Sequence, residues 1–452
     1  MKASFKRVLI ANRGEIAIRI QRACKELGLE TVQVYSEADS DSLAVLSADH
    51  ATCIGPARSS DSYLVARSIV AAAINANAGT IHPGYGFLSE NAEFARLCEE
   101  NDLAFAGPSA KVISMMGDKA MARRMAAEAG VPTTPGSEGT INSAEQARKI
   151  AQELGYPVIL KAAAGGGGRG MRIVEKPGDM ARHYDDAVRE AKISFSDSSL
   201  YVEKYLRKVR HIEMQVLSDG ERVLHLGERD CSIQRRNQKL LEEGPSPVLN
   251  DDIRARMGEA AVRLCRHVGY KSAGTIEFIF DQSSGQFYFM EMNTRVQVEH
   301  PVTEAITGID IVKQQLLIAR GEPLILAQPD VQFRGHAIEC RINAEDPDNH
   351  FSPCPGTVRS FHAPGGPGIR VDSHLYSGYS IPPFYDSLLG KIIAWGNTRE
   401  EAIARMLRAL SELRIEGVKT TAGFHQKLLV NDEFRLGQVH TTFVEDTMQE
   451  KR

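Results

Sequence analysis

Residues 274–293 read GTIEFIFDQSSGQFYFMEMN, two runs rich in aromatic and β-branched residues separated by a polar turn around Ser283–Gly285. This pattern predicts an antiparallel hairpin. We expect Phe280 to pair with Tyr288, because that register puts apolar side chains together on one face. The predicted core face consists of Ile276, Phe278, Phe280, Tyr288, Met290 and Met292.

The opposite face of this hairpin carries two carboxylates. In the expected register Glu277 lies directly opposite Glu291, and Asn293 lies two residues further along the same face. Like charges directly opposite each other destabilise a sheet, so the arrangement requires a cation between them. Carboxylate and amide oxygens suit a Mg²⁺ ion that bridges phosphates. The alternative is a solvated face whose carboxylates pair with nearby lysines or arginines.

A glycine-rich stretch, GGGGRG at 165–170, lies between two strand patterns, 158–161 and 171–174. It fits G-x-G-x-x-G, but a dinucleotide fingerprint must open a helix, and here a strand follows. Strand, glycine loop and strand predict a hairpin whose backbone N–H groups fold over a triphosphate. Lys161 and Lys119 would add positive charge. A mobile surface loop is the alternative.

The hairpin continues into TRVQVEHP at 294–301, which alternates polar and apolar residues. Arg295, Gln297 and Glu299 would share one side, which supplies a fork-shaped donor for a small oxyanion, an amide and a base. A plain edge strand is the alternative. Residues 229–239 are basic without interleaved aromatics, which indicates polyanion or nucleotide chemistry rather than base stacking.

Outside these stretches the chain divides into regions that differ in their predicted order of strands and helices. The first hundred residues alternate short strands with helices, at 8–11, 16–27, 31–35, 63–76 and 80–81. This order predicts a doubly wound parallel sheet. A large α+β middle region follows, and a polar connector from 321 leads to a third region with an amphipathic helix at 399–413. We therefore predict an α/β protein of several domains.

Composition limits the classes of partner and compartment. The 452 residues include 54 Lys and Arg against 58 Asp and Glu, a net charge of −4, so there is no general electrostatic case for nucleic acid or an anionic membrane. No uncharged apolar run approaches the length of a membrane span. Seven scattered cysteines without a C-x-x-C pair argue against a disulfide framework, and Cys231 is expected to be a packing residue. We expect a soluble cytoplasmic protein.

Six stretches carry a family resemblance. They are residues 11–17 (ANRGEIA), 82–91 (HPGYGFLSEN), 116–119 (MGDK), 161–171 (KAAAGGGGRGM), 291–301 (EMNTRVQVEHP) and 341–346 (RINAED). In this order, over about residues 5 to 445, they resemble the biotin carboxylase subunit of biotin-dependent carboxylases. The resemblance implies a pre-ATP-grasp N-terminal domain at 1–115, an ATP-grasp domain at 116–334 with a glycine-rich lid at about 134–206, and a carboxylase C-terminal domain at 335–447.

The resemblance also implies roles for individual residues. The implied ATP ligands are Lys119 and Lys161 at the phosphates, Gly166 and Gly167 in the closing loop, Glu203, Lys204 and Leu206 at the adenine, and His211 and Gln234 near the ribose. The implied metal ligands, Glu277, Glu291 and Asn293, coincide with the positions inferred from the hairpin register. The implied bicarbonate pocket consists of Lys239, Arg295, Gln297 and Val298. Glu299 would deprotonate bicarbonate, and Arg341 would face the biotin ureido oxygen.

The implied reaction is ATP-dependent carboxylation of biotin N1′ through carboxyphosphate, the first half-reaction of an acetyl-CoA or other acyl-CoA carboxylase. It would use ATP and two Mg²⁺ or Mn²⁺ ions, with bicarbonate and carrier-bound biotin as substrates. The sequence ends without a Met-Lys-Met biotinylation motif or a carboxyltransferase region, so a separate biotin carboxyl carrier protein and carboxyltransferase are the expected partners. Related subunits are often homodimers, and we expect one here.

Two alternatives from other classes share part of the pattern. Another ATP-grasp ligase, such as half of a carbamoyl-phosphate synthase, would share the loop and the metal hairpin but need not have Arg295 to Glu299 together with Arg341. A non-catalytic nucleotide-binding module would lose catalytic groups that are present here. Asn237 stands where many bacterial acetyl-CoA carboxylase subunits have His, which leaves the acyl acceptor open.

Overall fold

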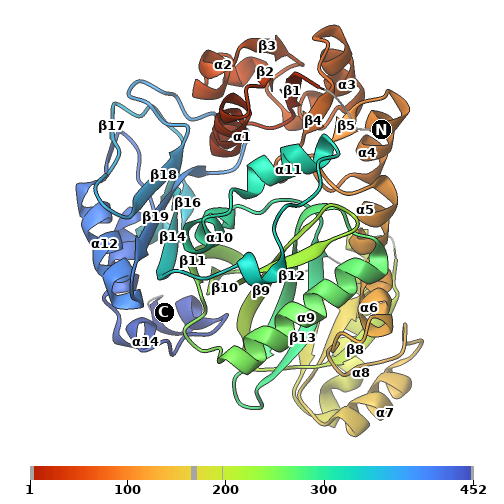
Figure 1. The fold of residues 1–452 in the computed structure, drawn as a ribbon. Helices are drawn as coiled ribbons and strands as arrows, with labels where there is room; N and C mark the ends of the chain where they lie inside the picture. Colours follow the sequence, from red (N-terminus) through yellow and green to blue (C-terminus); the bar gives the residue numbers. More distant parts are fainter. Residues whose placement is uncertain (1–4, 164–170, 196, 449–452) are drawn as a thin grey trace.

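The structure is a computed structural model that describes residues 5–163, 171–195 and 197–448. Gly166 and Gly167 lie outside the described residues. Figure 1 shows an N-terminal region, a central sheet with a smaller helical and stranded unit beside it, and a C-terminal region that packs against the other end of the central sheet.

The N-terminal region is a parallel sheet covered by helices. Its main elements are β1 (Arg7–Ile10), α1 (Gly14–Glu26), β2 (Glu30–Tyr35), β3 (His50–Cys53), α3 (Ala66–Asn75), β4 (Thr80–His82), α4 (Ala92–Glu100) and β5 (Ala104–Phe105). The strand order is β3-β2-β1-β4-β5, and every pair is parallel. The predicted doubly wound sheet is therefore confirmed.

The loops at the carboxyl edge of this sheet are tied together by one amide. Asn12, which follows β1, donates from Nδ2 to the carbonyl oxygens of Pro83 and Tyr85, each at 2.7 Å. Ligands of open α/β sheets bind outside this edge. Asn12 thus fixes the 82–91 loop where Tyr85 lines the large cavity of the molecule.

The glycine-rich stretch joins two strands of a small separate sheet. After α5 (Ala110–Gly117) and α6 (Lys119–Glu128), the chain forms α7 (Ala144–Leu154), β6 (Val158–Ala162), β7 (Met171–Val174), α8 (Met180–Phe195) and β8 (Leu200–Lys204). The strands are antiparallel in the order β7-β6-β8, and Lys161 pairs with Met171. The predicted strand, loop and strand hairpin is confirmed on both sides of residues 164–170.

One eight-stranded sheet runs through the middle and C-terminal regions. Its strands are β9 (Arg210–Ser218), β10 (Val223–Arg235), β11 (Gln238–Gly244), β12 (Ser272–Asp281), β13 (Gln286–Asn293), β14 (His336–Asn343), β18 (Ile369–Ser373) and β19 (Leu388–Gly396). The order is β13-β12-β9-β10-β11-β14-β19-β18. Because β11 pairs directly with β14, the polar connector separates two regions that share a sheet.

Helices cover this sheet and leave a polar face for the site. On β9 the side chains of Ile212, Met214 and Val216 enter the core beside α9 (Asp251–Val268), as strand alternation requires. His211, Glu213 and Gln215 therefore point to the opposite face. The C-terminal half of the sheet is covered by α10 (His300–Thr307), α12 (Arg399–Glu412) and α13 (Ala422–Leu429), and α11 (Ile311–Ala319) packs towards α1.

The hairpin of residues 274–293 forms, with one change of register. Glu277 lies opposite Glu291, as predicted, but Phe280 pairs with Phe287 and not with Tyr288. A β-bulge between residues 277 and 278 shifts the register by one, and Met290 is the residue left without a partner in the ladder. Bulges of this kind re-aim side chains beside active sites.

Because of the bulge, residues 287–289 of β13 face the opposite side of the sheet from the one predicted. Phe287 and Phe289 join the core, whereas Tyr288 is half-buried and Met290 is exposed and lines the cavity. The predicted core face is therefore wrong at these two positions, since each one-residue shift moves the following side chains to the other face.

Residues 294–299 do not form the edge strand that was one alternative for this stretch. They are irregular, and Glu299 is the N-cap residue of α10. The prediction that Arg295, Gln297 and Glu299 share one side is nevertheless confirmed, because all three line the same cavity while Val296 is buried. Among the described residues, no helix has the length and apolar character needed to cross a membrane.

Candidate active site

One large cavity, about 1640 Å³, lies between the N-terminal region, the small antiparallel sheet and the polar face of the central sheet. It is lined by every site residue that the sequence singled out within the described ranges. Around the small sheet these are Lys119, Lys161, Glu203, Lys204 and Leu206; on the central sheet and after it they are His211, Gln234, Lys239, Glu277, Glu291, Asn293, Arg295, Gln297, Val298, Glu299 and Arg341.

The ammonium group of Lys239 lies among three buried carboxylates. Its Nζ donates to Glu213 at 2.6 Å, to Glu277 at 2.9 Å and to Glu299 at 2.6 Å. These carboxylates come from β9, β12 and the N-cap of α10, so one cation joins three elements. Lys239 is placed there by β11, beside the turn that carries Asn237 in a left-handed conformation, φ 63°.

The charges around Lys239 control the protonation of the carboxylates. Burial alone would raise the pKa of Glu299, but Lys239, Arg341 and Arg229 together hold that pKa well below its ordinary value. Burial opposes ionisation of Glu277 in the same way, and Lys239 and His211 hold its pKa well below the usual range. Both carboxylates are therefore ionised at neutral pH.

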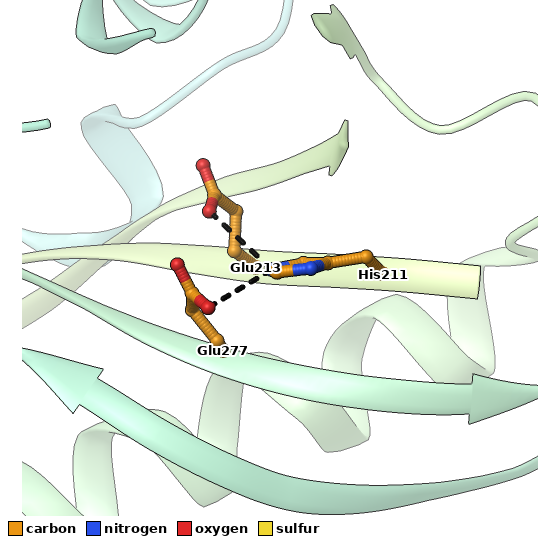
Figure 2. A group of neighbouring side chains, drawn as sticks. All are labelled: His211, Glu213 and Glu277. Carbon is orange, nitrogen blue, oxygen red and sulfur yellow. Dashed lines mark ion pairs between the residues drawn. The ribbon is translucent and has the colours of Figure 1, made fainter. Parts of the chain in front are cut away.

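His211 is oriented by an amide and faces a carboxylate. Gln234 donates from Nε2 to His211 Nδ1 at 2.8 Å, which leaves Nε2 facing the carboxylates. That nitrogen lies 3.0 Å from Glu277 and 3.9 Å from Glu213. Figure 2 marks both ion pairs. Gln234 thus holds the ring of His211 at one wall of the cavity, with Nε2 facing Glu277.

The metal hypothesis is tested by the donor set of the hairpin. Burial raises the pKa of Glu291, and the facing carboxylate of Glu277 adds to the shift, while Lys119 and His211 oppose it without cancelling it. Asn293 lies on the same face and donates to Glu277 at 2.9 Å. Two carboxylates and one amide oxygen facing a cavity fit a hard divalent cation.

The donors predicted to bind a small oxyanion are already engaged by protein groups. Arg295 donates to Glu90 at 2.8 Å and to Asn293 at 2.9 Å. Gln297 donates to Glu277 at 2.8 Å and accepts from the fully buried Arg229 at 2.8 Å. An anion that enters here would exchange with these partners rather than meet free donors.

Arg341 lies between two carboxylates at the inner end of the cavity. Its Nε donates to Glu242 at 2.6 Å and one terminal nitrogen donates to Glu299 at 3.0 Å. Its carbonyl oxygen accepts from Thr421 at 2.8 Å, which ties β14 to the start of α13. The guanidinium is therefore held in place while one edge still faces the cavity.

At the other end of the cavity, the small sheet supplies a second ion-pair group. Lys161 donates to Glu203 at 2.5 Å, and Glu203 also pairs with Arg123 from α6. Lys204 donates to the carbonyl oxygens of Gly155 and Tyr156. Lys119, at the start of α6, is exposed and lies near Glu291.

Glu213 was not among the predicted site residues, although it is fully buried and contacts both Lys239 and Arg229. It lies directly opposite Glu277 across β9 and β12. The alternation of Ile212, Met214 and Val216 implied that Glu213 shares the face of His211. It did not show that Glu213 lies beside Glu277, because these two residues are more than 60 positions apart in the sequence. Glu242, which holds Arg341, was missed for the same reason.

Cys231 is a buried packing residue, as predicted. Burial raises the pKa of its thiol well above the ordinary value, and its sulfur lies 4.0 Å from Glu299. All seven cysteines are free thiols. Within the basic stretch at 229–239, Arg229 is completely buried on Glu213, Gln215, Thr303 and Gln297, whereas Gln234 and Lys239 line the cavity.

Comparison with known proteins places this site in a family. Residues 4–113 match the biotin carboxylase N-terminal domain, residues 118–327 the ATP binding domain of the carbamoyl-phosphate synthase L chain, and residues 339–446 the biotin carboxylase C-terminal domain. A biotin carboxylase from Nostoc sp. is 55% identical over 443 residues, which cover 98% of this chain and 99% of the relative. The chain belongs to the biotin carboxylase family.

Two further relatives in this family differ in the carboxylase they serve. A pyruvate carboxylase subunit from Methanothermobacter thermautotrophicus is 51% identical, over 98% of this chain and 90% of its own length. The biotin carboxylase domain dimer of Hydrogenobacter thermophilus 2-oxoglutarate carboxylase, solved with MgADP, ADP and bicarbonate, has a TM-score of 0.92 and 50% identity over 99% of both chains. Membership makes this chain an ATP-dependent ligase, which decides against a non-catalytic nucleotide-binding module.

The ion group around Lys239 leads to a stability prediction. In Lys239→Met, Glu213, Glu277 and Glu299 lose their shared cation, and removal of one partner of a buried ion pair costs about 3–5 kcal/mol. The thermal midpoint should therefore fall clearly at neutral pH. Lys313→Met, which removes a partner of the exposed Glu26, should cost less than about 1 kcal/mol.

The difference in thermal midpoint between the wild type and Lys239→Met should depend on pH if it arises from charge, and should not if it arises from packing. The depressed pKa values of Glu277 and Glu299 stabilise the wild type above the ordinary glutamate pKa of about 4.3, and this contribution is lost as pH falls below it. In the variant the same carboxylates have raised pKa values and take up protons on folding. The gap between the two thermal midpoints should narrow from pH 7 to pH 5. A gap that is constant with pH would contradict the electrostatic account.

Proposed function

We propose that this chain carboxylates N1′ of biotin on a separate carrier protein, through carboxyphosphate, as the first half-reaction of an acyl-CoA carboxylase. The observation that carries the proposal is the contact of Glu299 with both Lys239 and Arg341, at 2.6 and 3.0 Å, at the inner end of a cavity that also contains the Glu277 and Glu291 pair. One group can thus accept a proton beside two cations that attract anions.

ATP would bind along the outer half of the cavity. We assign the adenine to the strip Glu203, Lys204 and Leu206, the ribose to His211 and Gln234, and the phosphates to Lys119, Lys161, Gly166 and Gly167. The pairing of Lys161 with Glu203 at 2.5 Å supports this assignment, because a lysine that already lies on the cavity wall can turn to a phosphate without leaving its strand.

Glu277, Glu291 and Asn293 would hold Mg²⁺ or Mn²⁺. When bound, such an ion neutralises charge on the phosphoryl group that is transferred. Mg²⁺ is usually bound by one or two carboxylates together with substrate phosphates, so this set of oxygens can serve two ions, the number we propose.

Bicarbonate would bind between Lys239, Arg295, Gln297 and the backbone of Val298. Its arrival draws Lys239 and Arg341 away from Glu299 and adds a negative charge, and both changes raise the pKa of Glu299 towards that of a useful base. Glu299 then accepts the bicarbonate proton, and the bicarbonate oxygen takes the γ-phosphoryl group of ATP. ADP and carboxyphosphate are the products of this step.

Arg341 would act in the second step. Carboxyphosphate would break into CO₂ and inorganic phosphate in the cavity. The phosphate would take the proton from biotin N1′, and N1′ would then attack CO₂. The ureido oxygen becomes negative at that moment, so a fixed guanidinium beside it stabilises the transition state.

The acyl-CoA acceptor, the partners and the oligomer are parts of the same proposal. We propose a separate carrier protein and carboxyltransferase, a homodimer, domain boundaries near residues 115 and 334, a lid at about 134–206, and a cytoplasmic location, which the seven free thiols support. A 2-oxo acid is the second candidate acceptor, because the relatives from pyruvate and 2-oxoglutarate carboxylases are about as similar to this chain as other family members.

The first test is carboxylation of free biotin. The purified full chain with MgATP and ¹⁴C-bicarbonate should label free biotin slowly, and ADP release should require bicarbonate and rise with biotin. Incubation without ATP is the control. If no label enters biotin at saturating ATP, the proposed half-reaction is wrong for the chain alone.

The metal assignment is tested by Glu291→Gln. Loss of one carboxylate removes charge stabilisation worth several kcal/mol, so turnover should fall about a hundredfold or more and the Mg²⁺ concentration for half-maximal rate should rise. Glu175→Gln makes the same chemical change at an exposed residue that pairs with Arg207 and should have no effect. Unchanged activity and metal response in Glu291→Gln would indicate a solvated face.

The division of roles between Glu299 and Arg341 is tested by two alanine variants. Glu299→Ala should lose bicarbonate-dependent ATP cleavage and biotin carboxylation together, since no carboxyphosphate forms. Arg341→Ala should lose mainly carboxyl transfer and keep much of the ATP cleavage. Circular dichroism and thermal melts must first show that both variants fold, because each removes a partner from a buried ion pair. Equal loss of ATP cleavage in the two would overturn this division.

A further inference from the structure

Two glutamates without an assigned role lie directly behind Arg341. Glu242 on β11 is paired directly opposite Glu339 on β14, and both side chains are completely buried. No donor among residues 5–163, 171–195 and 197–448 forms a hydrogen bond with either carboxylate oxygen of Glu339 or with Oε2 of Glu242. Two buried carboxylates thus face each other with three unpartnered oxygens.

The cations nearby do not neutralise this pair. Arg341 donates to the remaining oxygen of Glu242 at 2.6 Å, but it also serves Glu299. Lys391, opposite Arg341 on β19, donates to the carbonyl oxygen of Val298 at 2.7 Å and pairs with Glu15 at 3.1 Å. Glu339 therefore receives no hydrogen bond from either cation.

The groups that face the pair come from five elements. They are Cys231 on β10, Lys239 on β11, Arg341 on β14, Lys391 on β19, and Glu299 at the start of α10. His300, the residue after Glu299, is close to Lys391. Burial and the neighbouring Lys391 hold the pKa of His300 well below its ordinary value, so this ring is neutral. With both glutamates ionised, Glu242, Glu299 and Glu339 would compete for one guanidinium.

We propose that Glu242 and Glu339 share one proton, and that this pair is a positioning device that leaves the charge of Arg341 available to Glu299 and to the substrate. Two adjacent carboxylates in one buried site cannot both ionise without a cation between them. The presence of the shared proton is inferred from the geometry of the pair alone. Its effect on the reaction rests on the proposed role of Arg341.

The direction of the pKa values agrees with a shared proton. Burial raises the pKa of Glu242 to about 7, with Arg341 opposing the shift and Glu299 adding to it. Burial raises the pKa of Glu339 well above its ordinary value, with Lys391 opposing and Glu242 reinforcing the shift. When the shared proton leaves at alkaline pH, a second ionised glutamate attracts Arg341. Arg341 then stabilises the negative charge that develops on the ureido oxygen less well.

The proton is measured directly by infrared spectroscopy of the full chain without ATP, bicarbonate or biotin. The wild type should show a protonated carboxylic acid C=O band that shifts in D₂O, and Glu339→Gln should lose it, because the remaining Glu242 ionises beside Arg341. Glu242→Gln should lose it as well, which covers the case in which one variant does not fold. Glu243→Gln should keep it, since the carboxylate of Glu243 is ionised beside His336 and Arg399, with a pKa of about 2. No band in the wild type, or a band that survives both test variants, overturns the proposal.

The effect on the reaction is measured by pH profiles. Biotin carboxylation by the wild type should fall about tenfold for each pH unit above the pKa of the pair. Glu339→Gln keeps a neutral donor opposite Glu242 at every pH, so this alkaline limb should move upward by at least one pH unit, while a merely structural role would lower the rate equally at all pH values. An unmoved limb with the infrared band lost would refute the positioning role but not the shared proton. If the infrared band behaves as expected but neither the wild type nor any variant carboxylates biotin, the proposed function is wrong and the shared proton stands.

Discussion

The ammonium of Lys239 is the contact on which the inner cavity depends. It is shared by carboxylates from β9, β12 and α10, with every nitrogen to oxygen distance between 2.6 and 2.9 Å. Without this cation the three carboxylates would repel one another in a buried site, where removing charge from water is already costly. The polar face of the sheet can be buried under α10 because these charges satisfy each other.

The second constraint is that the central sheet includes strands from both sides of the polar connector that begins at residue 321. The pairing of β11 with β14 brings Arg341, which is 42 residues beyond Glu299, to within 3.0 Å of it. A carboxylate from the middle region and a guanidinium from the C-terminal region therefore face one cavity, and their relative position is fixed by backbone hydrogen bonds. Rigid placement of this kind is what electrostatic stabilisation requires.

The parts of the fold that depend on local pattern could be predicted from the sequence. The parallel N-terminal sheet, the hairpin on both sides of the glycine stretch and the facing of Glu277 and Glu291 follow from strand periodicity and turn residues. The bulge at Met290 could not, because nothing in the local pattern distinguishes an extra residue from a regular one. Tyr288 and Met290 were consequently placed on the wrong face. Glu213 and Glu242 were missed for a different reason, since strand alternation gives the face of a residue but not the identity of the neighbouring strand.

If the proposed function is right, the ion pairs also explain how this anion site is stable before its anions arrive. Lys161 is held by Glu203, Lys239 by three glutamates, Arg295 by Glu90, and Arg341 by Glu242 and Glu299. Each cation is thus balanced by a carboxylate of the protein, so none is buried alone. In the proposed reaction, a substrate anion would replace one protein carboxylate near a cation, and the carboxylate released from its partner would become more basic. Binding of the anion and activation of the proposed base, Glu299, would then be one electrostatic exchange.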